Sequence, residues 1–594
     1  MRRFIVGALA VLGGLLVLSV LGAVVAWHFL APRQPAIAAS TILELDLTQP
    51  PVEAPPRDAV SQLFLEERLS LRDVLDALQR AGADPRVKGV IARVGNDQIG
   101  TATVQQLRDA VAAFRGKGKF ALAFADTFGE FGPGNRSYYL ATAFDEIWLQ
   151  PLGQLGLTGL RAETPFLRGT LDLLGIVPRL DHRSEYKSAM NTLTDTEMKP
   201  AQREETEAIV KSVFGQMLRD VAAARRIAEP DLRKIIDGGP YLAAEALKLR
   251  LVDHVGYRDE AIAAARARAG GIAALLRPLP YLDRAGRPNR EGPTIALIYG
   301  DGIIARGGSE ENPLTGAGVL GSDTVARAFR SALADPTVRA ILFRIDSPGG
   351  SAVASETIWR ETVRARQANI PVIVCMGDVA GSGGYYIAAA ANKIVAEPAT
   401  LTGSIGVVAG KMLTSGFWSK IGVSWGVVDD GADAGFFSTL QDYTPEGQRH
   451  FESFLDTVYA GFKERVADGR RLDKETVEKV ARGRVWTGED AKALGLVDAL
   501  GGYETALRLA RIAAHLDPEG PITLKQYPPE RSAREEILDR LLGREPPAEA
   551  AISRQGLVAE LRRLARLAQP LLQRAESLAA PPGAVRMPAG PELR

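Results

Sequence analysis

The chain has 594 residues, of which 46% are hydrophobic and 24% are charged, a composition that excludes a disordered or fibrous protein. A single hydrophobic core does not usually grow to this length, so we expect at least two large domains. The 72 Lys and Arg residues nearly balance the 71 Asp and Glu residues and leave a net charge of +1, so nucleic acid is not expected as a partner. The single cysteine, Cys375, excludes an intramolecular disulfide and a thiolate metal cluster.

The N-terminal segment has the features of a membrane anchor. Residues 4–30 contain no Asp, Glu, Lys or Arg, and as a helix they would extend about 40 Å, enough to cross a bilayer. Two arginines precede this span and only Arg33 follows it closely, so the positive-inside rule places the rest of the chain outside the cytoplasm. Residues 36–38 resemble a signal-peptide cleavage site, but the apolar stretch is far longer than a signal peptide needs. We therefore predict that residues 1–31 form a cytoplasmic N-terminus and an uncleaved transmembrane helix.

The rest of the chain contains an internal repeat. Three segments of the first half recur in the same order in the second half, displaced by 245 to 251 residues. The matching pairs are 83–90 with 334–341, 138–141 with 385–388, and 246–253 with 491–498. Because the displacement is nearly constant, a few short insertions align the two halves, and we infer that one module has been duplicated.

We expect the first module to cover residues 41–282 and the second to cover residues 294–521, joined by a polar segment that contains Gly and Pro. Within each module, short apolar strands such as 341–343 and 372–374 alternate with helix-patterned segments such as 355–367. This alternation predicts an α/β fold in which the strands are largely buried.

Residues 522–594 form a tail rich in Pro and Arg. Five leucines between positions 557 and 571 follow helical spacing, with arginines on the other faces. Because Pro570 interrupts the pattern, we expect this amphipathic helix to pack on its own protein or on a neighbouring subunit rather than on a membrane surface.

The first difference between the modules is a pair of glycines. The second module reads Asp-Ser-Pro-Gly-Gly at 346–350, where the first module reads Gly-Asn-Asp-Gln-Ile at 95–99. Consecutive glycines let backbone amides approach a ligand closely, which is how an oxyanion hole is built. Gly349 and Gly350 are therefore candidate oxyanion-hole residues, although Pro-Gly-Gly also favours an ordinary tight turn.

The second difference is a serine in a glycine-rich turn. Ser382 lies in Gly-Ser-Gly-Gly-Tyr at 381–385, where a predicted strand turns into a helix, and it corresponds to Asn135 of the first module. A hydroxyl exposed at a helix N-terminus has the setting of a nucleophile. Ala380 departs from the G-x-S-x-G pattern, so an α/β-hydrolase is not indicated, and a purely structural serine is the alternative interpretation.

A serine nucleophile needs a base, and the sequence favours a lysine. The five histidines lie in no recognisable motif: they are His28, His182, His254, His450 and His515. Lys187, in Ser-Glu-Tyr-Lys-Ser at 184–188, corresponds to Ala434, so one module has the lysine and the other has the serine. Burial can lower the pKa of a lysine toward neutrality and make it a base. We therefore predict one composite site, the alternative being that Lys187 is an ordinary solvated lysine.

Ser404 is a third candidate. It lies in Thr-Gly-Ser-Ile-Gly at 402–406 and corresponds to Leu157 of the first module. A hydroxyl beside a buried amine would orient the amine and offset part of its desolvation cost. A serine whose hydrogen bonds are satisfied within a glycine turn is the alternative.

Together these segments resemble the signature motifs of the signal peptide peptidase A family, also called protease IV. The resemblance rests on 347–350, 381–385 and 402–406, and on the lysine segment 186–188 of the long, duplicated form, and it covers the chain from the anchor to about residue 520. It implies two tandem ClpP/crotonase-like modules built of repeated ββα units.

The resemblance also implies a Ser/Lys dyad that uses no metal and no cofactor. In that dyad Ser382 is the nucleophile, Lys187 is the general base and Ser404 orients the lysine. The backbone amides that would form the oxyanion hole belong to Gly383 and to Gly349 or Gly350. The implied substrates are signal peptides already released from preproteins and other unfolded apolar peptides. The implied enzyme is a bowl-shaped homotetramer, anchored in a bacterial inner membrane with its catalytic part in the periplasm.

Three functions remain open from the sequence. The first is a membrane-anchored serine endopeptidase, and the second is an inactive scaffold that binds apolar peptides. The third is a crotonase-type enzyme that acts on an acyl thioester, because crotonases hold an enolate with paired backbone amides. The pairing of Ser382 with Lys187 counts against a scaffold, and a periplasmic location counts against acyl-CoA chemistry. We therefore expect the peptidase.

Overall fold

The computed structural model describes residues 36–54, 69–95, 97–311 and 318–528. The predicted membrane anchor lies outside these ranges, as does the predicted tail beyond residue 528. None of the helices within these ranges is long and apolar enough to span a membrane.

A six-stranded parallel sheet forms the centre of the first half, with the strand order β8-β4-β3-β2-β1-β9. Its strands are β1 (Thr41–Asp46), β2 (Val87–Val94), β3 (Phe120–Ala125), β4 (Glu146–Leu149), β8 (His254–Val255) and β9 (Ala274–Leu276). The helices of this half are α3 (Leu71–Ala83), α4 (Thr101–Arg115), α5 (Asn135–Ala141), α6 (Arg168–Leu174), α7 (Asn191–Thr194), α8 (Pro200–Arg225), α9 (Glu229–Asp237), α10 (Ala243–Lys248), α11 (Arg258–Arg268) and α12 (Pro278–Ala285). A separate antiparallel pair consists of β5 (Gln154–Leu155) and β7 (Tyr241–Leu242).

The second half repeats this sheet, with the strand order β20-β16-β15-β14-β10-β21. Its strands are β10 (Thr294–Asp301), β14 (Val338–Ser347), β15 (Val372–Gly381), β16 (Lys393–Ala396), β20 (Ala499–Leu500) and β21 (Thr523–Tyr527). The sheet also includes β17 (Leu401–Gly403), parallel to β15, and β19 (Val485–Thr487), antiparallel to β17. A small sheet contains β11 (Ile303–Ala305), β12 (Glu310–Glu311) and β13 (Gly318–Gly321). The helices are α13 (Ser322–Ala334), α14 (Ala352–Gln367), α15 (Gly383–Ala388), α16 (Ser415–Lys420), α17 (Pro445–Arg470), α18 (Lys474–Val480), α19 (Gly488–Ala493) and α20 (Tyr503–Ala513).

The matching strand order confirms the duplication that the sequence predicted. In the first sheet β1 lies between β2 and β9, and in the second sheet β10 lies in the same way between β14 and β21. The two halves also begin their long helices, α8 and α17, with a proline at the first helical position, where its missing N–H costs nothing. One boundary differs from the expectation: β21 pairs with β10, so the second sheet extends past residue 521, where we expected the module to end.

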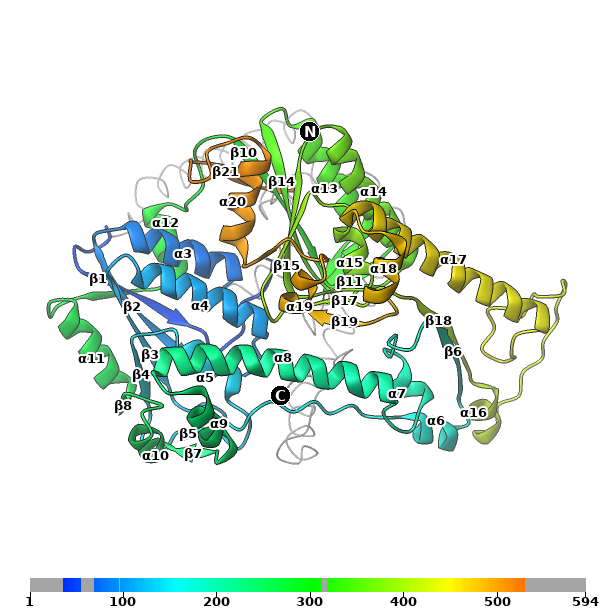
Figure 1. The fold of residues 1–594 in the computed structure, drawn as a ribbon, viewed down its shortest axis with the longest axis horizontal. Helices are drawn as coiled ribbons and strands as arrows, with labels where there is room; N and C mark the ends of the chain where they lie inside the picture. The colour runs from blue at the N-terminus through cyan, green and yellow to red at the C-terminus, as the bar shows by residue number, and fades with distance from the viewer. Residues whose placement is uncertain (1–35, 55–68, 96, 312–317, 529–594) are drawn as a thin grey trace, which may run out of the picture.

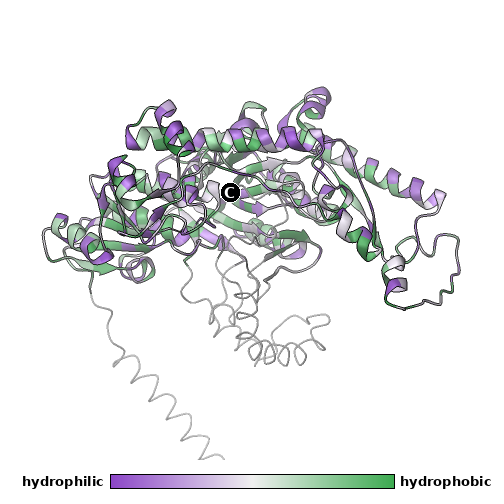
Figure 2. Ribbon diagram, turned by 90° about the horizontal axis from the view of Figure 1, so that it is seen from below, coloured by the Kyte–Doolittle hydropathy of each residue, from purple (hydrophilic) through white to green (hydrophobic). Residues whose placement is uncertain are grey.

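Both faces of the second sheet are buried, as its continuous apolar strands predict. In β14, Ile341 and Phe343 belong to a core that also contains residues of α13 and α14. Leu342, on the other face, belongs to a second core that includes side chains of α3 and α4 from the first half. The two halves therefore share hydrophobic core rather than forming separate globules. Figure 2 shows that the helices around the sheets alternate between hydrophilic and hydrophobic residues, as amphipathic covering helices must.

A buried ion pair attaches the segment after β1 to the second sheet. Arg344 in β14 has a side chain only 1% exposed, and its Nε and Nη2 donate to the Glu53 carboxylate at 2.6 and 2.9 Å. Its Nη1 donates to the carbonyl of Met376 at 2.8 Å, and its guanidinium lies over the ring of Tyr503. A buried charge persists only when it is paired and hydrogen-bonded in this way.

An antiparallel ribbon also joins the halves. β6 (Val177–His182) of the first half pairs with β18 (Val408–Leu413) of the second, in a register that sets Val177 opposite Leu413 and His182 opposite Val408. Figure 1 shows this ribbon beside α6 and α16, at the end of the molecule farthest from the first sheet. Because Lys187 follows β6 closely in the chain, the ribbon brings the lysine segment to the second half.

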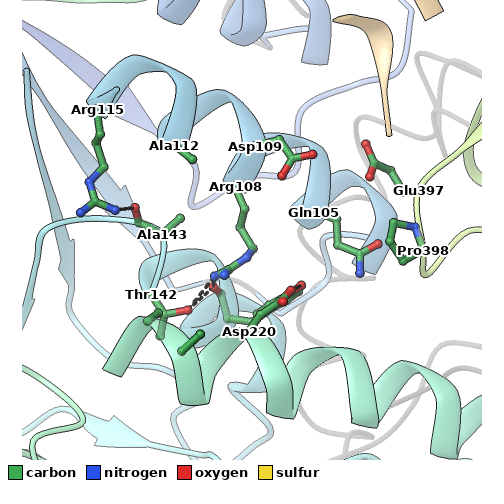
Figure 3. Close-up of a pocket in the computed structure, with 13 residues that line it drawn as sticks. Gln105, Arg108, Asp109, Ala112, Arg115, Thr142, Ala143, Asp220, Glu397 and Pro398 are labelled. Carbon is green, nitrogen blue, oxygen red and sulfur yellow. Dashed lines mark hydrogen bonds between the residues drawn. The ribbon is translucent and has the colours of Figure 1, made fainter. Parts of the chain in front are cut away.

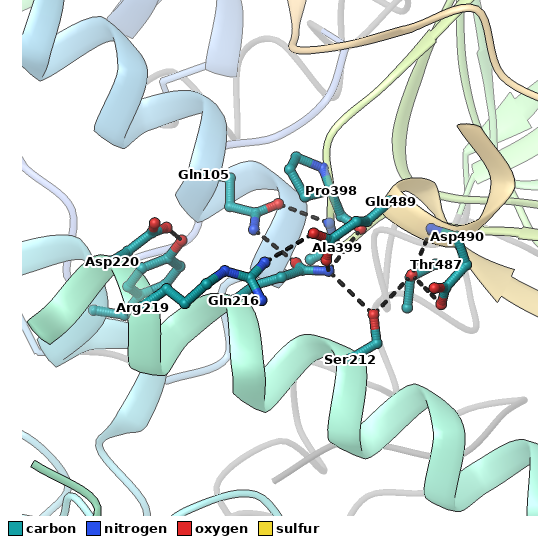
Figure 4. A network of polar contacts seen from close by, with 11 residues as sticks. Gln105, Ser212, Gln216, Arg219, Asp220, Pro398, Ala399, Thr487, Glu489 and Asp490 are labelled. Carbon is teal, nitrogen blue, oxygen red and sulfur yellow. Dashed lines mark hydrogen bonds and ion pairs between the residues drawn. The ribbon is translucent and has the colours of Figure 1, made fainter. Parts of the chain in front are cut away.

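Helix α8 crosses the middle of the molecule (Figure 1) and contacts α9 of the first half and β19 of the second. Figure 4 shows the polar network that fixes α8 to the second half: Gln216 Nε2 donates to the carbonyl of Pro398 at 3.1 Å and to Glu489 at 3.0 Å. Ser212 Oγ lies 3.0 Å from Thr487 Oγ1 at the end of β19. This network holds α8 in a fixed position relative to β19.

Candidate active site

Ser382 lies at a sharp turn between β15 and α15, as the sequence predicted. β15 ends at Gly381 and α15 begins at Gly383, so Ser382 is the residue that caps the helix. Its φ of 53° and ψ of −118° form a backbone conformation that L-residues rarely adopt, and its N–H donates to the carbonyl of Gly403 at 2.9 Å. A strained residue is retained only where the surrounding structure holds it, and such residues concentrate at functional sites.

Lys187 reaches this turn from the first half. Its segment is attached to the second half by backbone hydrogen bonds: the N–H of Arg183 donates to Val407 O at 3.1 Å, and the N–H of Tyr186 donates to Arg482 O at 3.2 Å. These bonds hold Lys187 within the second half, although it belongs to the chain of the first. The composite site is thus assembled within a single chain.

The side chain of Lys187 contacts both predicted serines. Nζ lies 3.2 Å from Ser382 Oγ, 2.8 Å from Ser404 Oγ and 2.9 Å from the carbonyl oxygen of Ser404. A neutral amine has two N–H donors and one lone pair. The carbonyl of Ser404 can only accept, and the hydroxyl of Ser404 can accept the second N–H. The lone pair is then left facing the hydroxyl of Ser382, which is the arrangement that a base requires.

Burial makes the neutral form of Lys187 accessible. The residue is 4% exposed, and desolvation lowers the pKa of its amine to about 8, although the carboxylate of Glu205 acts in the opposite direction. An ammonium group loses much of its hydration when it is buried, so the uncharged form becomes relatively more stable. The amine can therefore accept a proton near neutral pH, which an exposed lysine does not do.

Two glycines enclose the stem of Lys187. At Gly483, whose φ is +81°, a Cβ would lie 2.5 Å from the backbone nitrogen of Lys187. At Gly406 a Cβ would lie 3.1 Å from Lys187 Cδ and 3.0 Å from the Cα of Gly483. A side chain at Gly483 would therefore overlap the backbone of Lys187, and one at Gly406 would press on the lysine stem.

The backbone amides beside Ser382 can hold an anionic oxygen. Ile304 donates to Gly349 O and accepts from Ser351 N, both at 2.9 Å, so the intervening Gly350 N–H points away from Ile304. The Gly349 N–H already donates to Ser347 Oγ at 3.2 Å. A Cβ on Gly383 would lie 3.2 Å from the Gly350 nitrogen, so these two segments are adjacent. Of the two predicted alternatives, Gly350 is the one whose amide is free, together with that of Gly383, within the described residues.

The corresponding site of the first half is closed by its own side chains. Asn135, which corresponds to Ser382, accepts from the N–H groups of Thr158 and Gly159 at 3.2 Å and donates to the carbonyl of Gly159 at 2.9 Å. The carboxylate of Asp97 accepts the N–H of Ser137 at 2.8 Å, in the segment that corresponds to the glycine pair. At this place the first half therefore has the hydrogen-bonded amide side chain of Asn135 where the second half has the hydroxyl of Ser382.

Sequence reasoning missed Glu205 in α8. It is 4% exposed and accepts the N–H of Val485 at 2.5 Å and the hydroxyl of Ser188 at 3.4 Å. No motif contains this residue. Its burial next to the lysine segment depends on how α8 packs against β19, so the sequence pattern could not have identified it.

A separate pocket lies away from the dyad, between α4, α5, α8 and the turn at 397–398. Its volume is about 550 Å³, and Figure 3 shows Arg108, Asp109, Asp220 and Glu397 around it. Arg108 is engaged, since it donates to Thr142 Oγ1 at 2.6 Å. Neither Ser382 nor Lys187 lines this pocket, so we do not assign the predicted chemistry to it.

Comparisons with known proteins match both halves. The model of peptidase family S49 matches residues 127–271 and 364–517. "Protease 4" of Salmonella typhi is 34% identical over 489 residues, which cover 80% of this chain and 76% of that protein. "Serine protease SPPA, chloroplastic" of Arabidopsis thaliana is 31% identical over 77% of this chain and 67% of that protein. A solved ClpP1 mutant from Listeria monocytogenes is 16% identical over 36% of this chain and 93% of its own, with a TM-score of 0.22, too low to establish a shared fold.

The packing around the lysine stem generates a prediction. We expect Gly406→Ala to displace Lys187 and to reduce kcat/KM for an unfolded peptide by about tenfold or more, because a misplaced catalytic group is costly even at about 1 Å. The matched control is Gly461→Ala in α17, where a Cβ meets nothing within 4 Å and no loss of activity is expected. Thermal unfolding of both variants checks that the fold is retained. Full activity of Gly406→Ala would show that the lysine does not need this fit.

Proposed function

The chain belongs to peptidase family S49 and is a serine peptidase, and we propose that it is a membrane-anchored Ser/Lys endopeptidase that degrades released signal peptides and other unfolded apolar peptides. The observation that carries the proposal is the 3.2 Å contact between Lys187 Nζ and Ser382 Oγ. It joins a buried amine to a hydroxyl at a strained turn. In this proposal Ser382 is the nucleophile, Lys187 the general base and Ser404 the residue that orients the amine.

The first stage of the reaction forms an acyl-enzyme. Ser382 Oγ attacks the scissile carbonyl carbon, and its proton passes to the lone pair of Lys187 Nζ. The carbonyl oxygen becomes an oxyanion, which the amides of Gly350 and Gly383 would stabilise. Lys187 then gives its proton to the leaving amine as the peptide C–N bond breaks.

The second stage of the reaction releases the acyl group. Water takes the place of the departed amine and gives a proton to the neutral Lys187 as its oxygen attacks the ester carbon. The tetrahedral intermediate collapses, the bond from carbon to Ser382 Oγ breaks, and the proton returns from Lys187 to Ser382. Ser404 contributes by keeping the lone pair of the Lys187 amine directed at Ser382 in both stages of the reaction.

The substrate proposal follows from where the anchor would place this site. A signal peptide left in a bilayer is an apolar helix, whereas a protease binds its substrate extended so that the peptide backbone can pair with the site. An enzyme held at the periplasmic face of the inner membrane would meet such peptides as they emerge and unwind. The apolar span at residues 4–30 supports this placement.

The ribbon between the halves supports assembly into a ring of subunits. At the displacement of 247 residues, β18 corresponds to 161–166 and β6 corresponds to 424–429. Residues 424–429 are all exposed, form no strand of their own, and include the apolar side chains of Trp425 and Val427, which are candidates for an interface. If segment 424–429 of one chain paired with 161–166 of the next, the contact within each chain would be repeated between chains. We propose that four chains close such a ring, with the sites facing its interior.

The dyad is tested by substitution and labelling. We expect Ser382→Ala and Lys187→Ala each to reduce peptide hydrolysis by at least about a thousandfold, and the double variant to lose little more, because both residues act as one unit. A serine-directed phosphonate should label the unsubstituted protein at Ser382, a reaction that neither a peptide-binding scaffold nor an acyl-thioester enzyme would give. Circular dichroism checks the fold. Normal turnover by Lys187→Ala would eliminate the proposed base.

The dyad also predicts a pH dependence. Only the neutral amine can accept the serine proton, and burial lowers the pKa of Lys187 to about 8. We therefore expect kcat/KM to rise about tenfold per pH unit below pH 8 and to level off above it. A pH series from 6 to 10, with folding monitored at each point, measures this. A rate that falls from pH 6 to pH 9 in the folded enzyme would require a different base.

The assembly is tested at the exposed segment. We expect Trp425→Glu with Val427→Glu to lower the mass measured by light scattering from that of a tetramer. We also expect it to remove either the activity or the preference for unfolded peptides over folded, disulfide-bonded proteins. Ile272→Glu is the control, because Ile272 is 97% exposed but lies outside both segments. Equally selective activity from a monomer would contradict the enclosed site, as would rapid digestion of folded proteins by the tetramer.

A further inference from the structure

We propose that Glu205 is a positioning residue for the base, because its buried carboxylate fixes the Lys187 segment against β19 through hydrogen bonds to Ser188 and Val485. This inference rests on the dyad of the proposed function and adds to it a residue from outside the signature motifs. At the Glu205 side chain, helix α8 contacts both the lysine segment and β19.

The Glu205 carboxylate binds one residue beside Lys187 and one residue paired with the neighbour of Ser404. Oε2 accepts the hydroxyl of Ser188, the residue after Lys187, at 3.4 Å. Oε1 accepts the N–H of Val485 at 2.5 Å, and Val485 is paired in the sheet with Gly403, the residue before Ser404. One side chain thus connects the segment that supplies the amine with β19, whose partner strand β17 leads directly into Ser404, the residue that supplies the oxygen acceptors. A displacement of either would change the direction of the amine lone pair.

The charge of Glu205 acts on the same amine. Its carboxylate raises the pKa of Lys187, opposing the larger effect of burial, which lowers that pKa to about 8. Burial in turn raises the pKa of Glu205 to about 7, an effect that the Val485 N–H, the Arg484 charge and the Lys187 charge oppose. Each charge therefore favours the other, and removing one should make the other less stable.

The other ionisable groups around this pair have partners of their own. They are Tyr186 and Arg484 with Glu204, Arg482 with Glu185, Arg183 with Asp181 and Asp456, and His182 Nδ1 against the carbonyl of Ser184. Arg484 is the cation among them that acts directly on Glu205, and it is shared with Glu204 at 2.9 Å. Of the carboxylates named here, Glu205 is the one that raises the pKa of Lys187.

Three substitutions separate the charge of Glu205 from its hydrogen bonds. Glu205→Gln keeps an oxygen for the Val485 N–H but removes the charge, so we expect the rising limb of kcat/KM against pH to move to lower pH by up to about one unit. Glu205→Asp keeps the charge on a shorter stem and should keep the position of the limb with a lower kcat. Glu205→Ala removes both and should lower kcat at every pH. Glu207→Gln, an exposed carboxylate of the same helix, is the charge control and should match the unsubstituted enzyme.

The outcomes distinguish this inference from the proposed function. If Lys187→Ala retains activity, the dyad itself is wrong, whatever the Glu205 variants do. If Lys187→Ala is inactive but Glu205→Gln shows an unmoved limb, or Glu207→Gln shows the same shift, the role of Glu205 is overturned and the dyad stands. The rate of phosphonate labelling against pH gives a second reading of the same limb, and thermal unfolding identifies any variant that fails to fold. If Glu205→Gln does not fold, a lower kcat with an unmoved limb in Glu205→Asp supports the inference, and an unchanged kcat or a shifted limb overturns it.

Discussion

The burial of one amino group is the constraint on which this site depends. An exposed lysine is protonated at neutral pH and cannot act as a base, so Lys187 must lose most of its hydration. That loss is tolerable because Ser404 supplies two oxygen acceptors and Glu205 supplies a nearby negative charge. Neither half of the chain provides this environment alone. The lysine comes from the first half, whereas the serines that contact it come from the second, so the environment of this amine is created by the way the halves pack.

The packing that creates the base is distributed over distant parts of the chain. The ribbon of β6 with β18 delivers the lysine segment, and the network of Ser212 and Gln216 holds α8 against the second half. The ion pair between Arg344 and Glu53 attaches the segment after β1 to the second sheet. The shared hydrophobic core makes these contacts part of one folding unit. The 3.2 Å contact between Lys187 Nζ and Ser382 Oγ thus depends on contacts formed far from it.

Duplication allowed the two halves to diverge without losing the fold. The strand order is the same in both sheets, because it depends on apolar strands and covering helices that both copies retain. At the start of α5 one copy has Asn135 with its side chain hydrogen-bonded to the backbone, and before α15 the other copy has Ser382 with its hydroxyl facing Lys187. The first copy therefore contributes structure and the proposed base, and the second contributes the hydroxyl and the amides. Their specialisation is complementary, so neither copy can be exchanged for the other.

The sequence alone determined the duplication, the α/β class and the turn that presents Ser382, because these depend on local patterns and on comparing one half with the other. The same comparison singled out Lys187 and Ser404, which the structure brings within hydrogen-bonding distance. The sequence left open whether Gly349 or Gly350 offers a free amide, since that depends on the register with Ile304. It could not identify Glu205 or the fit at Gly483, because burial and close approach arise between segments far apart in the chain. Residue types and their spacing fixed which groups are present, and only the tertiary structure decided which of them are desolvated, how they are directed and therefore what chemistry they can perform.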